Sequence, residues 1–177
     1  NKKGMQNLNK QLQQISRVDG LTGVYNRRYW EETFALEQKR ILRNGAPGAV
    51  IMLDIDHFKK VNDTHGHPAG DYVIKTLAKV ISKCIRETDV CGRYGGEEFA
   101  ILLPETNTDN ATVVAERIRK TCERLVPVYE ETEIKFTVSL GVAEFHKSYK
   151  EHMVWLEKAD QALYKAKEGG RNRVCNF

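Results

Sequence analysis

Apolar and polar residues follow two different periods along the chain, one typical of helices and one typical of buried strands. Helical spacing of the apolar residues predicts helices over residues 27–43, 71–86, 109–125 and 151–167. The run AVIMLDID at 49–56 is almost continuously apolar and lies between turn-forming residues, which predicts a central strand buried on both faces. Residues 134–145 predict one long strand or a strand pair, and a short strand around Val174 closes the chain.

Two further features complete the predicted pattern. Residues 57–70 predict a short helix followed by a loop. Residues 90–94 and 97–103 flank Gly95 and Gly96, which predicts a hairpin with a two-residue type I′ turn and positive φ at both glycines. This mixed order of elements predicts an α+β fold of the ferredoxin-like or polymerase-palm type, in which helices cover a mostly antiparallel central sheet.

The first residues form a segment of their own. Residues 1–16 are polar except for Met5, Leu8, Leu12 and Ile15, whose spacing is that of a and d positions in a short coiled coil. A solvated terminal helix explains so short a pattern equally well. We therefore expect a linker helix over residues 1–18 and the main domain over 19–177. Because the chain begins at Asn1, we expect an upstream sensory or regulatory domain in the complete protein.

Composition narrows the classes of partner and location. The 28 basic and 24 acidic residues leave a formal charge of +4, which is too balanced to indicate a nucleic-acid-binding protein. The four cysteines are widely spaced without a C-x-x-C pair, so they predict neither a zinc site nor a disulfide framework. No apolar stretch approaches the roughly 18 residues of a membrane span. We therefore expect a cytoplasmic protein, or the cytoplasmic part of a membrane-bound sensor.

Acidic residues occur in pairs at the ends of predicted strands. Asp54 with Asp56, and Glu97 with Glu98, would be brought side by side by the sheet. Carboxylates at the edge of a core are costly to desolvate unless a cation compensates them. Mg²⁺, or Mn²⁺ in its place, typically uses one or two such carboxylates together with substrate phosphates. The pairs therefore predict metal-assisted phosphoryl transfer, with solvated strand-end charges as the alternative.

Six ordered segments resemble the successive motifs of one known family. They are DGLTGVYNRRYW (19–30), DIDHFKKVND (54–63), GHPAGD (66–71), RYGGEEF (93–99), SLGVA (139–143) and ADQALYKAKEGGRNRV (159–174). Together they resemble the GGDEF-family diguanylate cyclases, with the signature in its GGEEF form. One small departure is Leu140, where the family usually has Ile. The resemblance implies a nucleotidyl-cyclase-like palm fold and an enzyme that makes cyclic di-GMP from GTP.

The resemblance also implies roles for the residues around the signature. Asp54 would bind Mg²⁺ through its side chain, Ile55 through its backbone carbonyl, and Glu97 through its carboxylate. Glu98 would lie near the nucleophilic ribose hydroxyl as general base or as an orienting acceptor. The choice between Glu97 and Glu98 for the base stays open.

The resemblance assigns nucleotide recognition to residues in and around two helical segments. Asn62 and Asp71 would bind the guanine edge, because a carboxylate accepts hydrogen bonds that adenine cannot donate. As alternatives, Asn62 could be a helix C-cap and Asp71 an N-cap. Main-chain N–H groups around Phe58 and Lys59 would hold phosphates at a helix N-terminus.

Basic residues complete the expected binding set. Lys167 and Arg171 resemble the phosphate-binding pair of the family, although cations near a helix C-terminus are also expected from the macrodipole. The H-x-H pair of His65 and His67, like His57, lacks a third nitrogen or sulfur ligand nearby, which predicts loop structure and no metal site. We assign His67 to the substrate-binding residues.

Product control and assembly are implied as well. RETD at 86–89 has the form of the inhibitory R-x-x-D site, where Arg86 and Asp89 would bind a cyclic di-GMP dimer, with Arg117 contributed by another protomer. Its alternative is a surface ion pair. The chemistry needs two GTP molecules and the chain has one set of site residues, so we expect a twofold homodimer.

The sequence therefore predicts a Mg²⁺-dependent diguanylate cyclase domain restrained by its product. A degenerate module that binds GTP or cyclic di-GMP without turnover is the first alternative. A cyclase with a mixed-purine product and a purely structural dimerisation domain are the others.

Overall fold

The computed structural model describes the backbone of residues 1–177 and the side chains of residues 1–8 and 16–177. Six strands form the main sheet in the order β1-β3-β4-β2-β7-β8, and two short strands, β5 and β6, form a separate hairpin. The strands are β1 Tyr25–Asn26, β2 Gly48–Ile55, β3 Val90–Arg93, β4 Glu98–Pro104, β5 Val128–Tyr129, β6 Thr132–Glu133, β7 Val138–Glu144 and β8 Val174–Asn176. The helices are α1 Lys2–Ile15, α2 Arg27–Asn44, α3 Phe58–His65, α4 His67–Cys84, α5 Thr108–Arg124 and α6 His152–Glu168.

Strand β2 is the centre of the sheet. It pairs antiparallel with β4 on one side and with β7 on the other, while only the outer pairs β1–β3 and β7–β8 are parallel. The predicted mostly antiparallel α+β sheet is therefore confirmed. Of the two predictions for residues 134–145, the single strand is right, since β7 runs without interruption from Val138 to Glu144.

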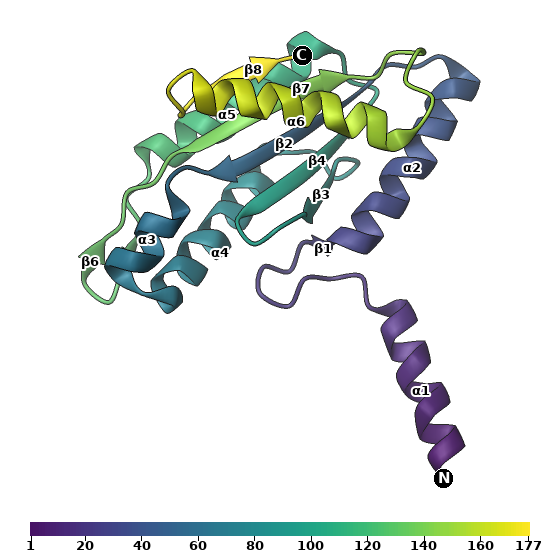
Figure 1. Ribbon diagram of the computed structural model, residues 1–177, viewed down its shortest axis with the longest axis horizontal. Coiled ribbons are helices and arrows are strands. Elements are labelled where there is room, and N and C mark those ends of the chain that lie inside the picture. Colours follow the sequence, from purple (N-terminus) through teal and green to yellow (C-terminus); the bar gives the residue numbers. More distant parts are fainter.

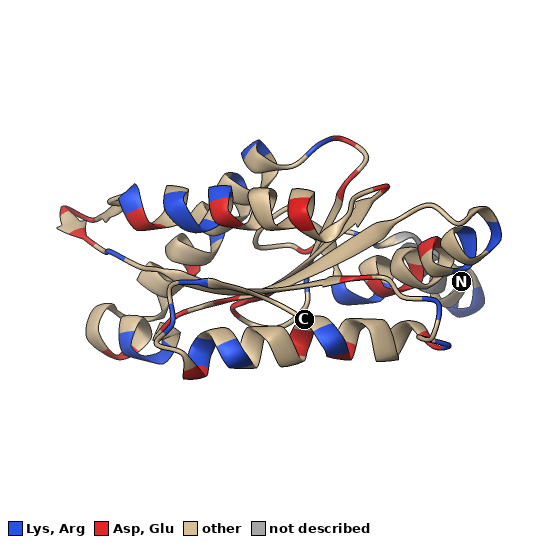
Figure 2. Ribbon diagram, turned by 90° about the horizontal axis from the view of Figure 1, so that it is seen from above, with Lys and Arg blue, Asp and Glu red and all other residues tan. Residues whose placement is uncertain are grey.

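The apolar run in β2 feeds two cores, one on each face of the sheet. Ala49, Ile51 and Leu53 pack with α4 and α5, whereas Val50 and Met52 pack with the aromatic residues of α2 and α6. This alternation follows from the two-residue period of a strand. Figure 2 shows helices on both sides of the sheet, with basic and acidic residues interspersed along them. The predicted strand buried on both faces is therefore confirmed.

The segment between α3 and α4 differs from the prediction. Only Gly66, with φ of 91°, separates the two helices, and α4 begins at His67. Pro68 lies in the first turn of α4, where its missing N–H costs nothing. The residues predicted as a loop before residue 71 are therefore helical, which places Asp71 inside α4 rather than at its start.

The turn that carries the glutamates also differs. Neither Gly95 nor Gly96 has a positive φ, so the prediction of a type I′ turn is wrong. The Glu98 carbonyl accepts hydrogen bonds from the N–H groups of Tyr94 (2.8 Å) and Gly95 (3.1 Å), and residues 94–97 connect β3 to β4. The Arg93 guanidinium also donates to the Gly96 carbonyl. The connection is therefore longer than the predicted two-residue turn.

The N-terminal helix lies apart from the sheet and its covering helices (Figure 1). Met5 and Leu8, two of the expected a and d positions, are 67% and 56% exposed. The side chains of Leu12 and Ile15 lie outside the described residues. None of the helices, over the residues that the structure describes, is long and apolar enough to cross a membrane.

Gly141 gives a test of the packing of α6 on the sheet. A Cβ at Gly141 in β7 would lie 2.2 Å from both the Ala159 carbonyl oxygen and the Leu163 backbone nitrogen of α6. Because those atoms belong to helix backbone, we expect Gly141→Ala to lower the free energy of unfolding by about 2–4 kcal/mol. Urea unfolding measures this change. Gly20→Ala, where a Cβ meets nothing within 4 Å, is the control, and equal losses in both variants would contradict the packing argument.

Candidate active site

The acidic site lies at one end of the three central strands. In the register of the sheet, Asp54 of β2 lies opposite Glu98 of β4 and opposite Ser139 of β7. The Ile55 N–H donates a hydrogen bond to the Glu97 carbonyl at 3.3 Å, which fixes the glutamate turn against the end of β2. The sheet thus brings together the acids that are more than 40 positions apart in the sequence.

Asp54 is the most constrained of these acids. It is 9% exposed, and its Oδ2 accepts a hydrogen bond from Lys167 Nζ at 2.5 Å. Its Oδ1 is buried and has no hydrogen-bond partner. Burial raises the pKa of the Asp54 carboxyl, Lys167 acts in the opposite direction, and the charges of Glu97 and Asp56 raise the pKa further. An unpartnered carboxylate oxygen at this depth needs a cation or a donor from a ligand.

Glu98 shares this environment. Burial raises the pKa of Glu98 from 4.5 to about 7, and the charges of Asp54 and Asp160 add to the increase. Its carboxyl lines a pocket of about 410 Å³ between the hairpin and α6, together with Tyr94 and Asp160. A carboxyl group with a pKa near neutrality can both accept and release a proton at the working pH.

Asp56 lies beside Asp54, but protein donors occupy both of its oxygens. Its Oδ1 accepts a hydrogen bond from Ser139 Oγ (2.6 Å), and its Oδ2 accepts from Thr137 Oγ1 (2.7 Å) and from the Asn172 N–H (3.0 Å). Its charge raises the pKa of the Asp54 carboxyl, whereas only Asp54 keeps a buried oxygen without a partner. Asp56 follows the end of β2, where the chain turns toward α3 and the alternation of a strand no longer applies.

The donor set at this end of the sheet fits a hard divalent cation. Asp54 offers a buried free oxygen, Glu97 lies close enough to raise the pKa of both Asp54 and Glu98, and Ile55 ends β2 between them. No group of three His, Cys, Asp or Glu side chains with metal-binding geometry exists among the described residues. Two carboxylates and a carbonyl therefore leave room for oxygen ligands from a substrate, as Mg²⁺ prefers.

Asn62 and Asp71 come from consecutive helices. Asn62 lies inside α3, whose C-cap is Gly66, and Asp71 is the fifth residue of α4, so both capping alternatives are wrong. The Asn62 Oδ1 is buried without a partner, and a Cβ at Gly70 would lie 1.9 Å from it. The missing side chain of Gly70 thus makes room for the Asn62 amide, while Asp71 is exposed beside it.

The first turn of α3 offers unpaired main-chain donors. α3 begins at Phe58, after His57 in a left-handed conformation with φ of 55° and no side-chain cap. The N–H groups of Phe58 and Lys59 therefore lack intrahelical acceptors, as in every first helical turn. Such a terminus favours an anion.

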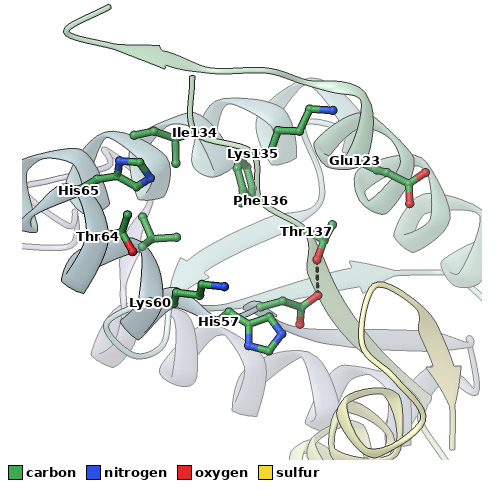
Figure 3. A pocket seen from close by; sticks show the side chains of 11 residues that line it. His57, Lys60, Thr64, His65, Glu123, Ile134, Lys135, Phe136 and Thr137 are labelled. Carbon is green, nitrogen blue, oxygen red and sulfur yellow. Dashed lines mark hydrogen bonds between the residues drawn. The ribbon is translucent and has the colours of Figure 1, made fainter. Parts of the chain in front are cut away.

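The basic residues of the site differ in their contacts. Lys167 binds Asp54, as described above, whereas Arg171 lies past the end of α6, exposed and with no hydrogen bond from its guanidinium to any described residue. His67 is exposed in the first turn of α4. Figure 3 shows His57, Lys60 and His65 of the α3 region facing residues 134–137 across a pocket of about 470 Å³, which His67 does not line.

One contact of the site was missed by the sequence reasoning. The Arg93 guanidinium donates to the Gly96 carbonyl (2.8 and 3.0 Å) and forms an ion pair with Asp19 at 3.3 Å. Asp19 is itself held by the N–H and hydroxyl of Thr22. Asp19 and Arg93 lie in two of the six family motifs, yet nothing in the spacing of these motifs indicates that the two side chains form an ion pair. The ion pair ties the start of the domain to the glutamate turn.

The R-x-x-D segment forms a hydrogen-bond network around a buried acid beside β4 and α5. The Asp89 side chain is 1% exposed and accepts hydrogen bonds from the Arg86 backbone N–H (2.8 Å) and guanidinium (3.0 Å). Arg86 also donates to the Pro104 carbonyl and the Thr106 hydroxyl. These residues line a pocket of about 310 Å³ together with Arg117. The alternative of a simple surface pair does not describe this arrangement, because the acid is buried.

Comparison with known proteins agrees with this geometry. The family model described as "Diguanylate cyclase, GGDEF domain" matches residues 16–173. The chain is 46% identical over 168 residues to "Uncharacterized protein YhcK" of Bacillus subtilis, covering 94% of this chain and 47% of that protein. It is 38% identical over 172 residues to "Diguanylate cyclase A" of Treponema denticola, covering 94% and 46%. The chain thus spans about half the length of these relatives.

Solved structures give the same result. The GGDEF domain of DgcB from Caulobacter crescentus, in complex with c-di-GMP, is similar with a TM-score of 0.88 and 35% identity, over 91% of this chain and 95% of that one. The active GGEEF domain of a diguanylate cyclase from Vibrio cholerae has a TM-score of 0.81 and 38% identity, over 86% and 96%. With the fold, the ordered motifs and the family model in agreement, the chain belongs to the GGDEF family of diguanylate cyclase domains.

Proposed function

We propose that this chain is a Mg²⁺-dependent diguanylate cyclase domain that condenses two GTP molecules into cyclic di-GMP and two pyrophosphates. The observation that carries the proposal is the buried, unpartnered Oδ1 of Asp54 at the strand end that Glu98 shares. The relatives named as diguanylate cyclases support the reaction class. A purely structural domain would have no need of a desolvated acid in this position.

Asp54, the Ile55 carbonyl and Glu97 would hold the metal ion, and Mn²⁺ would accept the same oxygen donors. When bound, the ion supplies positive charge to the triphosphate as charge moves onto the leaving group. Lys167 already lies on Asp54 Oδ2, at the same carboxylate. We propose that Lys167 and Arg171 contact triphosphate oxygens, while the free N–H groups of Phe58 and Lys59 bind them at the start of α3.

In each half-reaction the 3′ oxygen of one GTP bonds to the α-phosphorus of the other, and the bond from that phosphorus to pyrophosphate breaks. The ribose hydroxyl must lose its proton. We propose Glu98 as the acceptor, since a pKa of about 7 suits a base at neutral pH, and Glu97 as the metal ligand. The alternative for Glu98, an acceptor that only orients the hydroxyl, predicts a weaker effect of its removal.

Guanine selection follows from the α3–α4 pair. The buried Asn62 Oδ1 and the exposed Asp71 carboxylate offer acceptors for the N1–H and exocyclic amine of guanine. Adenine lacks this pair of donors, so bound ATP would leave one of the two acceptors unpaired. His67 lies in the first turn of the same helix as Asp71 and completes the proposed substrate-binding set.

The test of the function is product formation. The purified chain is incubated with GTP and Mg²⁺, and the nucleotides are separated by chromatography. We expect cyclic di-GMP and pyrophosphate, with no product from ATP alone. If GTP binds but no cyclic dinucleotide forms at any protein concentration, the chain is a binding module and the cyclase proposal is wrong.

Glu98→Gln separates the catalytic role of this residue from its effect on stability. We expect a loss of turnover of about 10²–10⁴-fold, because the base is removed. The raised pKa of Glu98 means that the folded protein binds the extra proton between pH 4.5 and about 7, so wild-type stability falls as pH rises through this range.

The variant should therefore be more stable than wild type at pH 8, by about 1 kcal/mol after solvent screening, and equal to it near pH 4. Urea unfolding at both pH values, without metal, measures the difference. A variant that is less stable at pH 8 would contradict the assigned environment of Glu98.

Assembly as a twofold dimer follows from the single set of site residues. We propose that two protomers, each with one GTP, meet face to face, and that the linker helix over residues 1–18 transmits an upstream signal to this encounter. Below the dissociation constant of the dimer, specific activity should rise with protein concentration. A dilution series under saturating GTP measures it, and constant specific activity at every concentration would exclude a transient dimer.

We propose that the pocket at Arg86, Asp89 and Arg117 binds the product and restrains the enzyme. Loss of a charge-assisted contact to phosphate by Arg86→Ala should raise the half-inhibitory concentration of cyclic di-GMP by about tenfold or more. Inhibition curves measure the shift. Glu87→Ala, at an exposed neighbouring position, is the matched control, and an unchanged curve for Arg86→Ala would rule out this site.

We also propose a cytoplasmic location, where GTP is available. Cys84, Cys91, Cys122 and Cys175 are all unpaired thiols, which supports a reducing compartment.

A further inference from the structure

The loop after α6 presents Arg171 in a backbone conformation that needs support. Arg171 and Asn172 have φ values of 64° and 46°, so two consecutive residues other than glycine are left-handed. Such conformations persist where the surrounding structure over-determines them. The Arg171 guanidinium is exposed and makes no hydrogen bond to the described residues, so the loop backbone fixes only the point and the Cα–Cβ direction from which this side chain extends.

The supporting contacts converge on Asn172. Its N–H donates to Asp56 Oδ2 at 3.0 Å, its side-chain oxygen accepts from Arg119 at 3.1 Å, and its side-chain nitrogen donates to Glu123. Arg119 and Glu123 are themselves ion-paired on α5. The Arg171 N–H donates to the Ala166 carbonyl and the Arg171 carbonyl accepts from Arg173 Nε, so the contact of the Asn172 N–H with Asp56 fixes the next peptide of the same loop.

The Asp56 carboxylate that accepts this hydrogen bond is buried and held by further donors. Asp56 is 6% exposed, and two hydroxyl groups orient its oxygens: Ser139 of β7 at 2.6 Å, and Thr137, just before β7, at 2.7 Å, the latter marked by the dashed line in Figure 3. Neither lysine nor arginine pairs with it among the described side chains. A buried carboxylate that accepts from three neutral donors is fixed in position, because each lost bond would leave a desolvated group unpaired.

We propose that Asp56 is a positioning residue for triphosphate binding, which holds the Asn172 amide and thereby directs Arg171 toward the phosphates. The inference rests on the proposed function, in which Arg171 binds the triphosphate. It gives the second acid of the DID segment a role different from that of Asp54. Asp56 acts through Arg171 and touches neither the metal site nor the substrate.

Comparing the affinities for two different nucleotides distinguishes this positioning role of Asp56 from a general structural role. GMP lacks the β and γ phosphates, whereas a GTP analogue with a methylene group in place of the α,β-bridging oxygen keeps them and cannot release pyrophosphate. Calorimetric titration with Mg²⁺ gives both affinities. Asp56→Ala should weaken the analogue by about 10–100-fold and leave GMP within about twofold, because a misplaced contact is lost only where phosphates reach it.

Asp56→Asn is the conservative control. Its side-chain oxygen can still accept from the Asn172 N–H, and its amide nitrogen can donate to the Ser139 hydroxyl, which is both donor and acceptor. We expect affinities within about threefold of wild type. A structural role that required only the negative charge would instead make the two variants equally poor.

A double-mutant cycle tests whether Asp56 acts through Arg171. Arg171→Ala should weaken the analogue, and adding Asp56→Ala to it should cause little further loss. Additive losses would overturn the inference. Hydrogen exchange at the Asn172 amide, which should accelerate in Asp56→Ala, reports on the contact without any nucleotide.

If Asp56→Ala does not fold, the Thr137→Val/Ser139→Ala double variant replaces it. This variant should show the same selective loss of affinity for the analogue to a smaller degree, and an equal loss for both nucleotides would overturn the inference.

Failure of the proposed function gives a different result. If wild type forms no cyclic dinucleotide but prefers the analogue to GMP, and Asp56→Ala removes that preference, the cyclase proposal fails and the role of Asp56 stands. If wild type forms cyclic di-GMP but Asp56→Ala weakens both nucleotides equally, or neither, the inference alone is wrong.

Discussion

The structure depends on one energetically unfavourable feature, the desolvated carboxylate of Asp54 at the buried end of the central strand. One oxygen is paired with Lys167 and the other has no partner, while Glu97 and Glu98 bring like charges to the same place. Lys167 can reach it because α6 lies directly on β7, where Gly141 has no side chain to keep the helix away. The packing of a helix on a sheet and the charge balance of the site are therefore linked through a single glycine.

The site is organised at the expense of stability. Glu98 has a raised pKa, Asn62 leaves a buried oxygen unpaired, and Arg171 and Asn172 keep a left-handed backbone. Each feature disfavours the isolated fold, and a bound cation or base would compensate the first two. Proteins retain such features at functional sites and compensate for them elsewhere. Here the compensation lies in the two apolar cores on the faces of the sheet.

The glutamate turn is supported from outside the sheet. Arg93 joins the Gly96 carbonyl to Asp19. One guanidinium thus links the segment before β1 to the turn that carries the glutamates. In the loop of Arg171, the Asn172 N–H donates a hydrogen bond to the Asp56 carboxylate. Two different kinds of contact therefore position the two halves of the site.

Much of the fold and of the site could be predicted from the sequence, because those parts depend on local periodicity and on short motifs. The apolar run of β2 determined a strand buried on both faces, helical spacing located four helices, and the ordered motifs identified Asp54, Asn62, Asp71, Glu97 and Glu98 as site candidates. Residues near one another in sequence carry their own signal, which is why the predicted strand and helices agree with the structure, whereas the roles of these site candidates stay predictions.

Only the tertiary structure decided the rest. The glutamate turn lacks the predicted positive φ, and Ile55 at the end of β2, 42 positions before Glu97, donates a hydrogen bond to it. Both oxygens of Asp56 are occupied because Ser139, Thr137 and Asn172, more than 80 positions away, supply donors that no local pattern reveals. The sequence by itself determined which side chains the site has available, and long-range hydrogen bonds decided which way each of them points.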